Sequence, residues 1–429
     1  MAEKLQTAYK TILGDNFPPT LEIKLGTTVL KYEKVGWDIG GEVKGLRYGE
    51  NPGQEAAMYR LVKGNLVLGD VQTIQPGKWL VSDTELLQSG KHPGKINMTD
   101  ADNALNILRY FADEQVVAIM KHNNPSGVAM GAAIGNSLLD AYQKANDADR
   151  LAAFGGAIAL NKAVDKATAE AISQAYAEVI VAPEYESGVM DIFEKKKNLR
   201  VMKIANMARL KEWVGEVVID FKSLIDGGLI LQTSYVPKAK TLKDIKKLPL
   251  GYHEHKGEMH KITRAPTEQE LRDMWFGWLV ESGVTSNSVL YVKNGATVGI
   301  GTGEQDRVGV AEIARDKAYT KLKDRLCFKE TGKSYNELLH NVLHGKDPDL
   351  IGVIVDIDDR VPRLKGGLEG SVMVSDAFFP FRDGVDVGLE QGVTAVIQPG
   401  GSERDFEVIE ACNERKATMI FSGQRSFKH

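Results

Sequence analysis

The sequence predicts an α/β fold, because apolar strand-like runs alternate with capped helical segments along the chain. Val116–Met120 is continuously apolar, as a strand covered on both faces should be. Thr267 and Glu270 have the spacing of a capping box that opens a helix. Asn294–Gly295 separates two apolar runs and is the dipeptide best suited to a tight hairpin turn.

The first helix and strand that the pattern resolves lie in the first third of the chain. A helix over 100–108, capped at Thr99, is predicted to lead into the strand at Val116–Met120. Pro125 and Gly127 are expected to end that strand. Chemistry in open α/β sheets is usually placed just beyond the carboxyl ends of such strands.

Further elements follow in the second half. The helix opened by Thr267 is predicted to extend through Leu279, and strands over 288–293 and 296–301 flank the hairpin turn. Residues 395–398 are predicted to form a short buried strand. Together these elements extend the α/β alternation to the C-terminal region.

The segment after 395–398 predicts a turn and a helix start. Pro399 and two glycines form the turn, and Ser402 is predicted to cap a helix that begins at Glu403. The free N–H groups of a first helical turn can bind an anion. An ordinary β-α connection explains the same residues, so both interpretations stand.

Length and composition indicate a large soluble protein. At 429 residues the chain can form two or three domains, or one large duplicated unit. The charged stretch over 205–257 suggests a division into 1–255, which holds the motif at the end of the first strand, and 256–429. No apolar run is long enough to span a bilayer, so no membrane association is expected.

Charge and cysteine content exclude several classes of protein. A net charge of −4 argues against a nucleic-acid binder but allows a small anionic ligand, which needs only a few cations. Cys327 and Cys412 have no metal-ligand spacing, so neither a disulfide framework nor a zinc site is expected. Met1–Leu5 has no apolar stretch typical of a secretory signal, and we expect a cytoplasmic protein.

Lys121 and His122 are the first candidates for catalysis, because they follow the buried strand directly. Histidine can remove a proton near neutral pH, and an ammonium can stabilise a developing oxyanion. The alternative is a histidine bonded to a backbone carbonyl beside a solvated lysine. Adjacent strand residues point to opposite faces, so the chain must turn at His122 if both serve one site, and Asn123–Pro125 is the predicted turn.

Three other features carry weaker signals. Gly299–Gly303 is followed by Glu304 in place of a third glycine, which disfavours a dinucleotide loop and suggests a strand exit that a ligand approaches. Three phenylalanines over 378–381 form either a core cluster or an aromatic slot, with Asp383 able to bind ring nitrogens. The tail over 425–429 would on its own be a frayed basic end.

Together these motifs resemble the transformylase half of the bifunctional purine-biosynthesis proteins, the AICAR formyltransferases. The resemblance covers nearly everything from Asn16 to the C-terminus, in the family's order. Its segments are LRYGENPGQEAAMYR from Leu46, KHNNPSGVAMG from Lys121, ADRLAAFGGAIALN from Ala148, EVIVAP from Glu178, APTEQELRDMWFGW from Ala265, SNSVLYVKNGATVGIGTGEQDRV from Ser286, SDAFFPFRDGVDVGLEQGV from Ser375 and PGGSERDFEVIEAC from Pro399.

The resemblance implies a duplicated cytidine-deaminase-like α/β/α fold with active sites at a homodimer interface. It implies formyl transfer from 10-formyltetrahydrofolate to the 5-amino group of AICAR, giving FAICAR and tetrahydrofolate. Under fifty residues precede the RYGENP segment, so the chain looks like a free-standing transformylase without the cyclohydrolase part. Zinc deaminase chemistry is not expected, because the His-x-Glu and Pro-Cys-x-x-Cys signature is missing.

The resemblance also implies roles for individual residues. It makes His122 the proton acceptor, Lys121 the transition-state stabiliser and Asn287 the amide that aligns the reacting groups. Implied substrate contacts are Arg47, Tyr48, Gly155, Glu178, Arg307, Arg425 and Phe427. Implied folate contacts are Val308, Phe378, Pro380, Asp383, Ser402 and Glu403. A monovalent cation such as K⁺ is implied near Ser286, Ser288 and Asp376.

Four positions depart from the family pattern: Gly53, Ser126, Glu178 and Ser426. Of these, Glu178 bears on a substrate contact, since some members have aspartate there. Two other functions remain as alternatives. One is an AICAR-binding regulatory protein without catalysis, which the Lys-His pair and Asn287 disfavour. The other is the same acceptor chemistry with formate and ATP, which the lack of a Walker loop disfavours.

Overall fold

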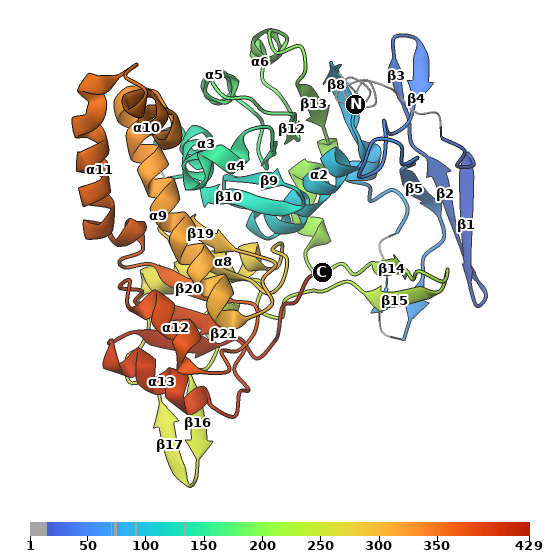
Figure 1. Cartoon of the computed structure of the whole chain (residues 1–429). Helices are drawn as coiled ribbons and strands as arrows, with labels where there is room; N and C mark the ends of the chain where they lie inside the picture. Colours follow the sequence, from blue (N-terminus) through green and yellow to red (C-terminus); the bar gives the residue numbers. More distant parts are fainter. Residues whose placement is uncertain (1–14, 70, 73–74, 91, 133) are drawn as a thin grey trace. The chain divides into compact units, whose positions relative to one another are not determined.

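The computed structural model describes residues 15–429 except 70, 73–74, 91 and 133, so Met1–Leu5 lies outside the described residues. The fold is mixed α/β, as predicted, and packs into two compact units (Figure 1). The first unit comprises the chain up to Val116, then Met120–Asn123 and Gly155–Val236. The second comprises Val117–Ile119, Asn124–Phe154 and Pro237–His429. Neither unit is a continuous piece of chain.

The first unit is built on strands in the order β11-β12-β13-β8, the first three parallel and β8 antiparallel to β13. All side chains of β11 and β12 are buried, as in a sheet covered on both faces. Its strands are β1 Thr20–Leu25, β2 Thr28–Lys34, β3 Trp37–Ile39, β4 Glu42–Lys44, β5 Tyr59–Lys63, β6 Val67–Leu68, β7 Val71–Gln72, β8 Glu85–Ser89, β11 Ala157–Leu160, β12 Val179–Ala182, β13 Arg200–Lys203, β14 Ile219–Ser223 and β15 Leu229–Thr233. Its α-helices are α2 Lys95–Leu108, α5 Lys166–Ser173 and α6 Val189–Phe193.

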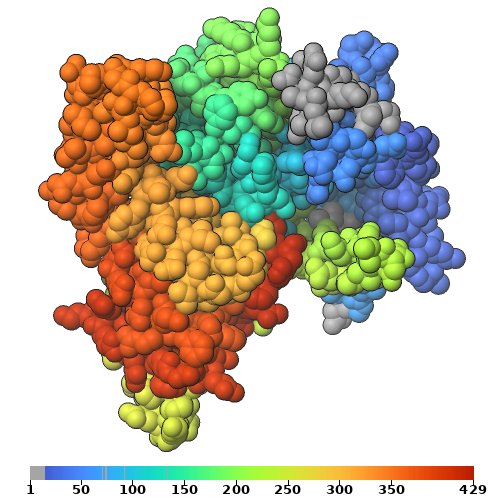
Figure 2. All heavy atoms as spheres, viewed as in Figure 1, coloured from blue at the N-terminus to red at the C-terminus, as the bar shows by residue number. Residues whose placement is uncertain are grey.

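The second unit has the strand order β22-β21-β20-β18-β19-β10 and helices around it. Its strands are β10 Asn124–Met130, β16 Tyr252–His255, β17 Glu258–Lys261, β18 Val289–Lys293, β19 Ala296–Gly301, β20 Val372–Ser375, β21 Ala395–Gln398 and β22 Thr418–Phe421. Its α-helices are α3 Ser137–Ala148, α4 Arg150–Ala153, α7 Leu242–Ile245, α8 Glu268–Glu281, α9 Arg307–Thr331, α10 Tyr335–Leu343, α11 Ile351–Arg363, α12 Arg382–Leu389 and α13 Asp405–Glu414. Figure 2 shows the β16-β17 hairpin projecting from this unit.

Strand β9, Val116–Lys121, is divided between the units. Its first five residues are buried, as the apolar run predicts. Short 3-10 helices occur at Val81–Asp83, Arg109–Phe111, Ala205–Trp213, Pro348–Leu350 and Lys365–Gly367. No helix among the described residues is long and apolar enough to cross a membrane.

The two strongest local predictions are confirmed. Thr267 Oγ1 accepts from the Glu270 N–H at 3.2 Å, and a Glu270 carboxylate oxygen accepts from the Thr267 N–H at 2.7 Å, which completes the capping box of α8. Asn294 and Gly295 have φ of 53° and 69°, and they join β18 to β19 as the hairpin turn.

Two predicted helix starts are wrong. Helix α2 begins at Lys95 rather than after Thr99, because Asn97 Oδ1 accepts from the Gly94 N–H at 3.1 Å and caps the earlier turn. Helix α13 begins at Asp405 rather than at Glu403. There the Asp405 carboxylate accepts from the N–H groups of Gly401 and Ser402 at 2.7 and 3.1 Å. The chain's own carboxylate therefore lies at the turn that precedes the helix.

The end of strand β9 also differs from the prediction. Pro125 and Gly127 do not stop the sheet, since both lie within β10. The chain reverses at His122 and Asn123, which have φ of 53° and 63° and form a two-residue turn between β9 and β10. Gly127 is required by packing, because a Cβ there would lie 2.0 Å from the Ala145 carbonyl oxygen of α3.

The glycines of β19 have a packing role that the sequence did not reveal. A Cβ on Gly299 would lie 2.2 Å from the Ala314 carbonyl oxygen, and one on Gly301 would lie 2.2 Å from that of Val310. These positions therefore let α9 lie directly on β19. The expectation of a ligand approaching the backbone at these two glycines is replaced by close helix packing, which also fixes Arg307 at the first position of α9.

Candidate functional site

The first unit holds Lys121 in a defined environment. Its ammonium donates to the Gly155 carbonyl oxygen at 2.7 Å. Gly155 has φ of +70°, and a Cβ there would lie 3.2 Å from Lys121 Nζ and 3.6 Å from Glu178 Oε1. Three predicted residues are thus gathered at one place, where the glycine makes room for the ammonium.

His122 is exposed at the turn, and two side chains of α2 hydrogen-bond to the backbone of this turn. Asp100 accepts from the Asn123 N–H at 2.5 Å, and Asn103 Nδ2 donates to the Asn123 carbonyl oxygen at 2.8 Å. Both α2 side chains are buried. Burial raises the pKa of Asp100, while the Asn123 N–H and the charges of His122 and Lys121 act to lower it. The left-handed turn is therefore fixed by a buried scaffold that presents His122 to solvent.

Glu178 lies next to this cluster and carries its negative charge. Its carboxylate lies 3.8 Å from the Arg200 guanidinium and 3.5 Å from Asn97 Nδ2. Arg200 is only 3% exposed, and burial lowers its pKa while Glu178 opposes that shift. Desolvation, and then Glu178, raise the pKa of the neighbouring Tyr176. The residue that departs from the family pattern is thus a partly exposed carboxylate that pairs with a buried guanidinium.

Arg47 and Tyr48 lie together, as two contacts to one ligand would require. The Arg47 guanidinium carbon lies 4.5 Å from the centroid of the Tyr48 ring, and Arg47 Nη2 donates to the Tyr48 hydroxyl. Buried His92 is a further neighbour. Burial, followed by the charges of Arg47, Lys44 and Arg200, lowers its pKa to about 4. His92 is therefore neutral at physiological pH, and the region carries an excess of cationic side chains.

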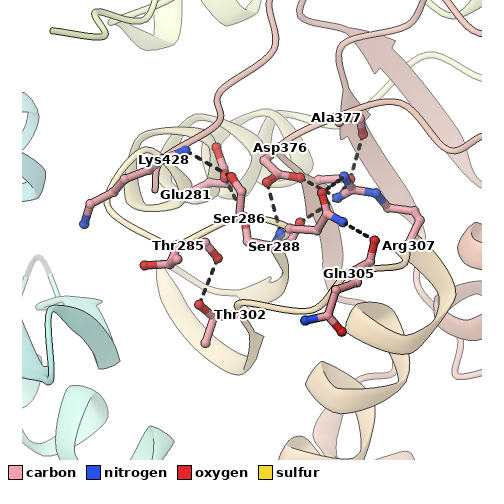
Figure 3. Close-up of polar contacts among 12 residues, drawn as sticks. Glu281, Thr285, Ser286, Ser288, Thr302, Gln305, Arg307, Asp376, Ala377 and Lys428 are labelled. Carbon is pink, nitrogen blue, oxygen red and sulfur yellow. Dashed lines mark hydrogen bonds and ion pairs between the residues drawn. The ribbon is translucent and has the colours of Figure 1, made fainter. Parts of the chain in front are cut away.

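In the second unit, Asn287 is held by two partners, Arg307 and Gln305, which are labelled in Figure 3. Its Oδ1 accepts from Arg307 Nη2 at 3.0 Å, and its Nδ2 donates to the Gln305 carbonyl oxygen at 3.0 Å. These two bonds fix the orientation of the carboxamide, with its oxygen toward Arg307 and its nitrogen toward the Gln305 carbonyl oxygen. One Nδ2 hydrogen and one Oδ1 lone pair remain for other partners.

Arg307 is 7% exposed and makes several bonds at once. Its Nη1 donates to the Ser288 carbonyl oxygen at 3.1 Å, to Ser375 Oγ at 3.1 Å and to the Asp376 carboxylate. The buried guanidinium is therefore bonded to four groups of its own unit: the Ser288 carbonyl oxygen, Ser375 Oγ, the Asp376 carboxylate and Asn287 Oδ1.

Besides Asp376, the site contains a second buried acid, Glu281, which is the last residue of α8. Ser288 Oγ donates to Glu281 Oε1 at 2.7 Å, and the Ser288 N–H donates to Asp376 Oδ2 at 3.0 Å. Both carboxyls are 0% exposed. Burial, and then the charge of Asp376, raise the pKa of Glu281 well above its ordinary value. We assign the negative charge of the pair to Asp376, which binds Arg307.

The tail is ordered against the same loop and is not frayed. The Ser286 N–H donates to the Lys428 carbonyl oxygen at 2.9 Å, and the Lys428 N–H donates to Ser286 Oγ at 3.0 Å. Lys428 Nζ donates to the Gly283 carbonyl oxygen at 2.9 Å. Arg425 lies over the Phe427 ring at 4.3 Å from its centroid. The interpretation of a disordered basic end is wrong.

The predicted folate residues divide by exposure. Phe379 is fully buried in the core, whereas Phe378 and Phe381 are 40% and 48% exposed. The three phenylalanines therefore form both a core contact and an exposed aromatic surface. Asp383 Oδ1 accepts from the Gly384 N–H at 2.8 Å. The remaining predicted residues of this group are placed as follows: Val308 and Pro380 half-buried, Ser402 buried and Glu403 exposed.

A separate apolar cavity of about 510 Å³ lies in the first unit. Trp79, Trp213 and Phe221 are among its walls, and none of the predicted site residues lines it. It is therefore not the site that the sequence indicates.

Sequence reasoning missed Asp100, Arg200 and Glu281, since single charged residues inside helical or strand patterns give no signal until the fold buries them.

Comparison with known proteins now bears on these clusters. A family model described as AICARFT/IMPCHase bienzyme matches residues 22–317. The chain belongs to this family. As an AICARFT/IMPCHase bienzyme family member it is 38% identical over 395 residues to "Bifunctional purine biosynthesis protein PurH" of Magnetococcus marinus, covering 90% of this chain and 60% of the relative. The relatives of the same name in Persephonella marina and Aquifex aeolicus are 37% and 34% identical, over 90% of this chain and 59% of each relative.

The AICARFT/IMPCHase family member thus spans about six-tenths of the length of the curated relatives it matches. The family match includes both clusters, since Lys121, His122, Asn287 and Arg307 all lie within residues 22–317. The tail and the exposed phenylalanines lie beyond residue 317, outside the range of the family model.

Proposed function

We propose that the protein transfers a formyl group from 10-formyltetrahydrofolate to the 5-amino group of AICAR, in purine biosynthesis. The observation that carries the proposal is the Lys121–His122 pair, with the ammonium anchored 2.7 Å from the Gly155 carbonyl oxygen and the imidazole exposed in a rigid turn. Family membership and the printed names of the relatives support the same pathway.

The chemistry follows from what an aromatic amine needs. The AICAR amine is conjugated with its ring and is a weak nucleophile, so a base must take its proton as it attacks the formyl carbon. His122 is assigned to that step. The attack creates a tetrahedral oxyanion, which the Lys121 ammonium stabilises. Collapse of this oxyanion breaks the bond from the formyl carbon to N10 of the folate, and N10 gains a proton as tetrahydrofolate leaves. Asn287 is assigned to align the formyl group, because its carboxamide is already oriented by Arg307 and Gln305.

The charge of the first unit's cluster favours an anionic substrate. Lys121, Arg47 and Arg200 bring three positive charges, whereas Glu178 brings the single negative charge paired with Arg200. A ribotide phosphate would balance this excess, and a guanidinium can bind it in bidentate fashion. We assign the ribotide to this cluster and to Arg425 and Phe427 of the tail.

The folate side is assigned to the exposed aromatic surface of the second unit. Phe378 offers a face for a pterin ring, and Asp383 is assigned as an acceptor for ring N–H groups. Val308, Pro380, Ser402 and Glu403 complete the assignment. Ser402 already engages Asp405 and Arg404 through its backbone and side chain, so its role would be to shape the loop.

The assembly and the cation are also proposals. We propose a homodimer with interfacial active sites and a duplicated cytidine-deaminase-like architecture, in the cytoplasm.

A monovalent cation such as K⁺ would use Ser286, Ser288 and Asp376. In the structure Ser286 Oγ accepts from Lys428, Ser288 Oγ donates to Glu281 and Asp376 binds Arg307. These oxygens do not form a free set of acceptors, so no step is derived through a cation. Among the described residues no group of three His, Cys, Asp or Glu side chains could hold a metal ion.

The donor is tested by incubating the purified protein with AICAR and either 10-formyltetrahydrofolate or formate with ATP. Formation of FAICAR with the folate alone is expected. Product formed only with formate and ATP would replace the donor assignment. AICAR binding by calorimetry without product from either donor would instead support the regulatory alternative.

A further inference from the structure

We infer that Glu281 is a positioning residue for Asn287, acting through Ser288, Asp376 and Arg307. The inference rests on the proposed formyl transfer, in which Asn287 aligns the reacting group. Glu281 belongs to no predicted site, and its hydrogen bond to Ser288 is the first link of a chain that ends at the Asn287 carboxamide.

Figure 3 labels Glu281, Ser288, Asp376 and Arg307, the first four residues of this connection. Glu281 Oε1 accepts from Ser288 Oγ at 2.7 Å, and the N–H of Ser288 donates to Asp376 Oδ2 at 3.0 Å. The other oxygen of Asp376 binds Arg307 Nη1. Arg307 Nη2 then reaches Asn287 Oδ1 at 3.0 Å. The links join side chains, and at Ser288 they pass through its backbone N–H. The groups have few alternative orientations, because each is buried or bonded on two sides.

Glu281 contacts the backbone segment around Asn287 through Ser288, whose hydroxyl donates to its carboxyl. It directly follows Asn287, and its N–H, hydroxyl and carbonyl oxygen are all bonded, to Asp376, Glu281 and Arg307 respectively. A residue tied by three groups fixes the backbone on one side of Asn287. Removing the acceptor for the hydroxyl would free the Ser288 side chain and release one of these three constraints.

The cost of Glu281 argues that it has a function. The side chain is 0% exposed and stands at the last position of α8, near the buried carboxylate of Asp376. Among the described residues the Arg307 guanidinium forms its ion pair with Asp376 and not with Glu281. A buried carboxyl without such a partner destabilises the fold, and groups of this kind concentrate at functional sites.

Glu281→Gln and Glu281→Ala separate positioning from bulk stability. Glutamine keeps an acceptor oxygen for Ser288 Oγ, whereas alanine removes it. We expect kcat with AICAR and 10-formyltetrahydrofolate to fall at least about tenfold in Glu281→Ala, with KM for AICAR within about twofold of wild type. Glu281→Gln should stay within about threefold of wild type in kcat.

Asp273→Ala is the matched control, because Asp273 is a buried acid on the same helix. Its carboxylate caps the hairpin turn by accepting from the N–H groups of Asn294 and Gly295 at 3.0 and 2.7 Å. We expect this variant to lose stability in urea unfolding while its kcat, per folded molecule, stays near wild type. A wild-type kcat in folded Glu281→Ala, or a loss in Glu281→Gln equal to that in Glu281→Ala, would overturn the inference.

Crystal structures of the two Glu281 variants give a readout that needs no turnover. The Arg307 Nη2 to Asn287 Oδ1 distance should remain near 3.0 Å in Glu281→Gln and exceed hydrogen-bonding range in Glu281→Ala. An unchanged bond in Glu281→Ala would refute the positioning role. A wild-type protein without transferase activity would refute the proposed function instead, and the crystal structures would still decide whether Glu281 orients Asn287.

Discussion

Arg307 Nη2 donates a 3.0 Å hydrogen bond to Oδ1 of Asn287, and the same guanidinium is bonded to Asp376. The family resemblance implies that Arg307 contacts the ribotide, yet its side chain is 7% exposed and engaged inside its own unit. The bond therefore gives Arg307 a second role, which is to orient the carboxamide that the proposal places at the formyl group.

Arg307→Lys should separate these two roles. Lysine keeps the charge but cannot donate in a fork to Asp376 and Asn287 together. We expect kcat to fall roughly 10- to 100-fold, because Asn287 loses its orientation, with a smaller change in the AICAR dissociation constant. Steady-state kinetics and calorimetry measure the two effects. A large loss of AICAR affinity at unchanged kcat would assign Arg307 to ribotide binding alone.

Gly155→Ala should impair both stability and catalysis. The backbone has φ of +70°, and the new Cβ would lie 3.2 Å from the Lys121 ammonium nitrogen. The left-handed conformation should cost about 1 kcal/mol of unfolding free energy, and displacement of Lys121 should lower kcat about tenfold or more. Gly26→Ala is the control, since Gly26 has φ of +60° and no neighbouring atom would lie within 4 Å of the added methyl carbon. Equal catalytic losses in both variants would contradict a specific effect on Lys121.

His92 predicts how stability depends on pH. Its folded pKa of about 4 lies below the value of about 6.5 expected when unfolded, so the unfolded state binds more protons between these values. Its contribution is complete above pH 6.5 and is lost as the pH falls toward 4. The loss at pH 5 should be about 2 kcal/mol. Urea unfolding at pH 7 and pH 5 should show a smaller difference for His92→Gln than for wild type. An identical difference would contradict the buried neutral state.

The tail should contribute through two separable contacts. Arg425→Ala is expected to weaken AICAR binding with little change in kcat, because Arg425 is assigned to the phosphate. Truncation after Phe427 keeps Arg425 and Phe427 but removes the Lys428 bonds to Ser286 and Gly283. This truncation should lower kcat by loosening the loop before Asn287. If the truncated protein turns over at the wild-type rate, the tail does not support that loop.

Local chemistry explains which parts of the fold the sequence predicts. The capping box of Thr267 and Glu270 and the Asn294–Gly295 turn are short-range features, and both are confirmed. The predicted start of helix α13 is two residues early, because Ser402 Oγ accepts from the Arg404 N–H outside the helix while the Asp405 carboxylate binds the N–H groups of Gly401 and Ser402. Such competition between neighbouring caps is not visible in a pattern of residue types.

Long-range packing explains what the sequence could not show. Residues 124–154 belong to the second unit although they follow the Lys121–His122 turn of the first, so no single cut in the chain separates the units. Gly299 and Gly301 suggested ligand access but admit α9 instead. Glu281 and Arg200 become candidate functional residues only because the fold buries them next to other charged side chains. These features depend on partners far away in the sequence.

The most direct test of the account is single-turnover formyl transfer with saturating AICAR and 10-formyltetrahydrofolate, comparing wild type with His122→Ala. Removal of the base should lower the rate at least about 100-fold, while AICAR affinity and the urea midpoint remain near wild type. A rate within a few-fold of wild type in the folded, AICAR-bound variant would contradict the assignment of His122 as the proton acceptor.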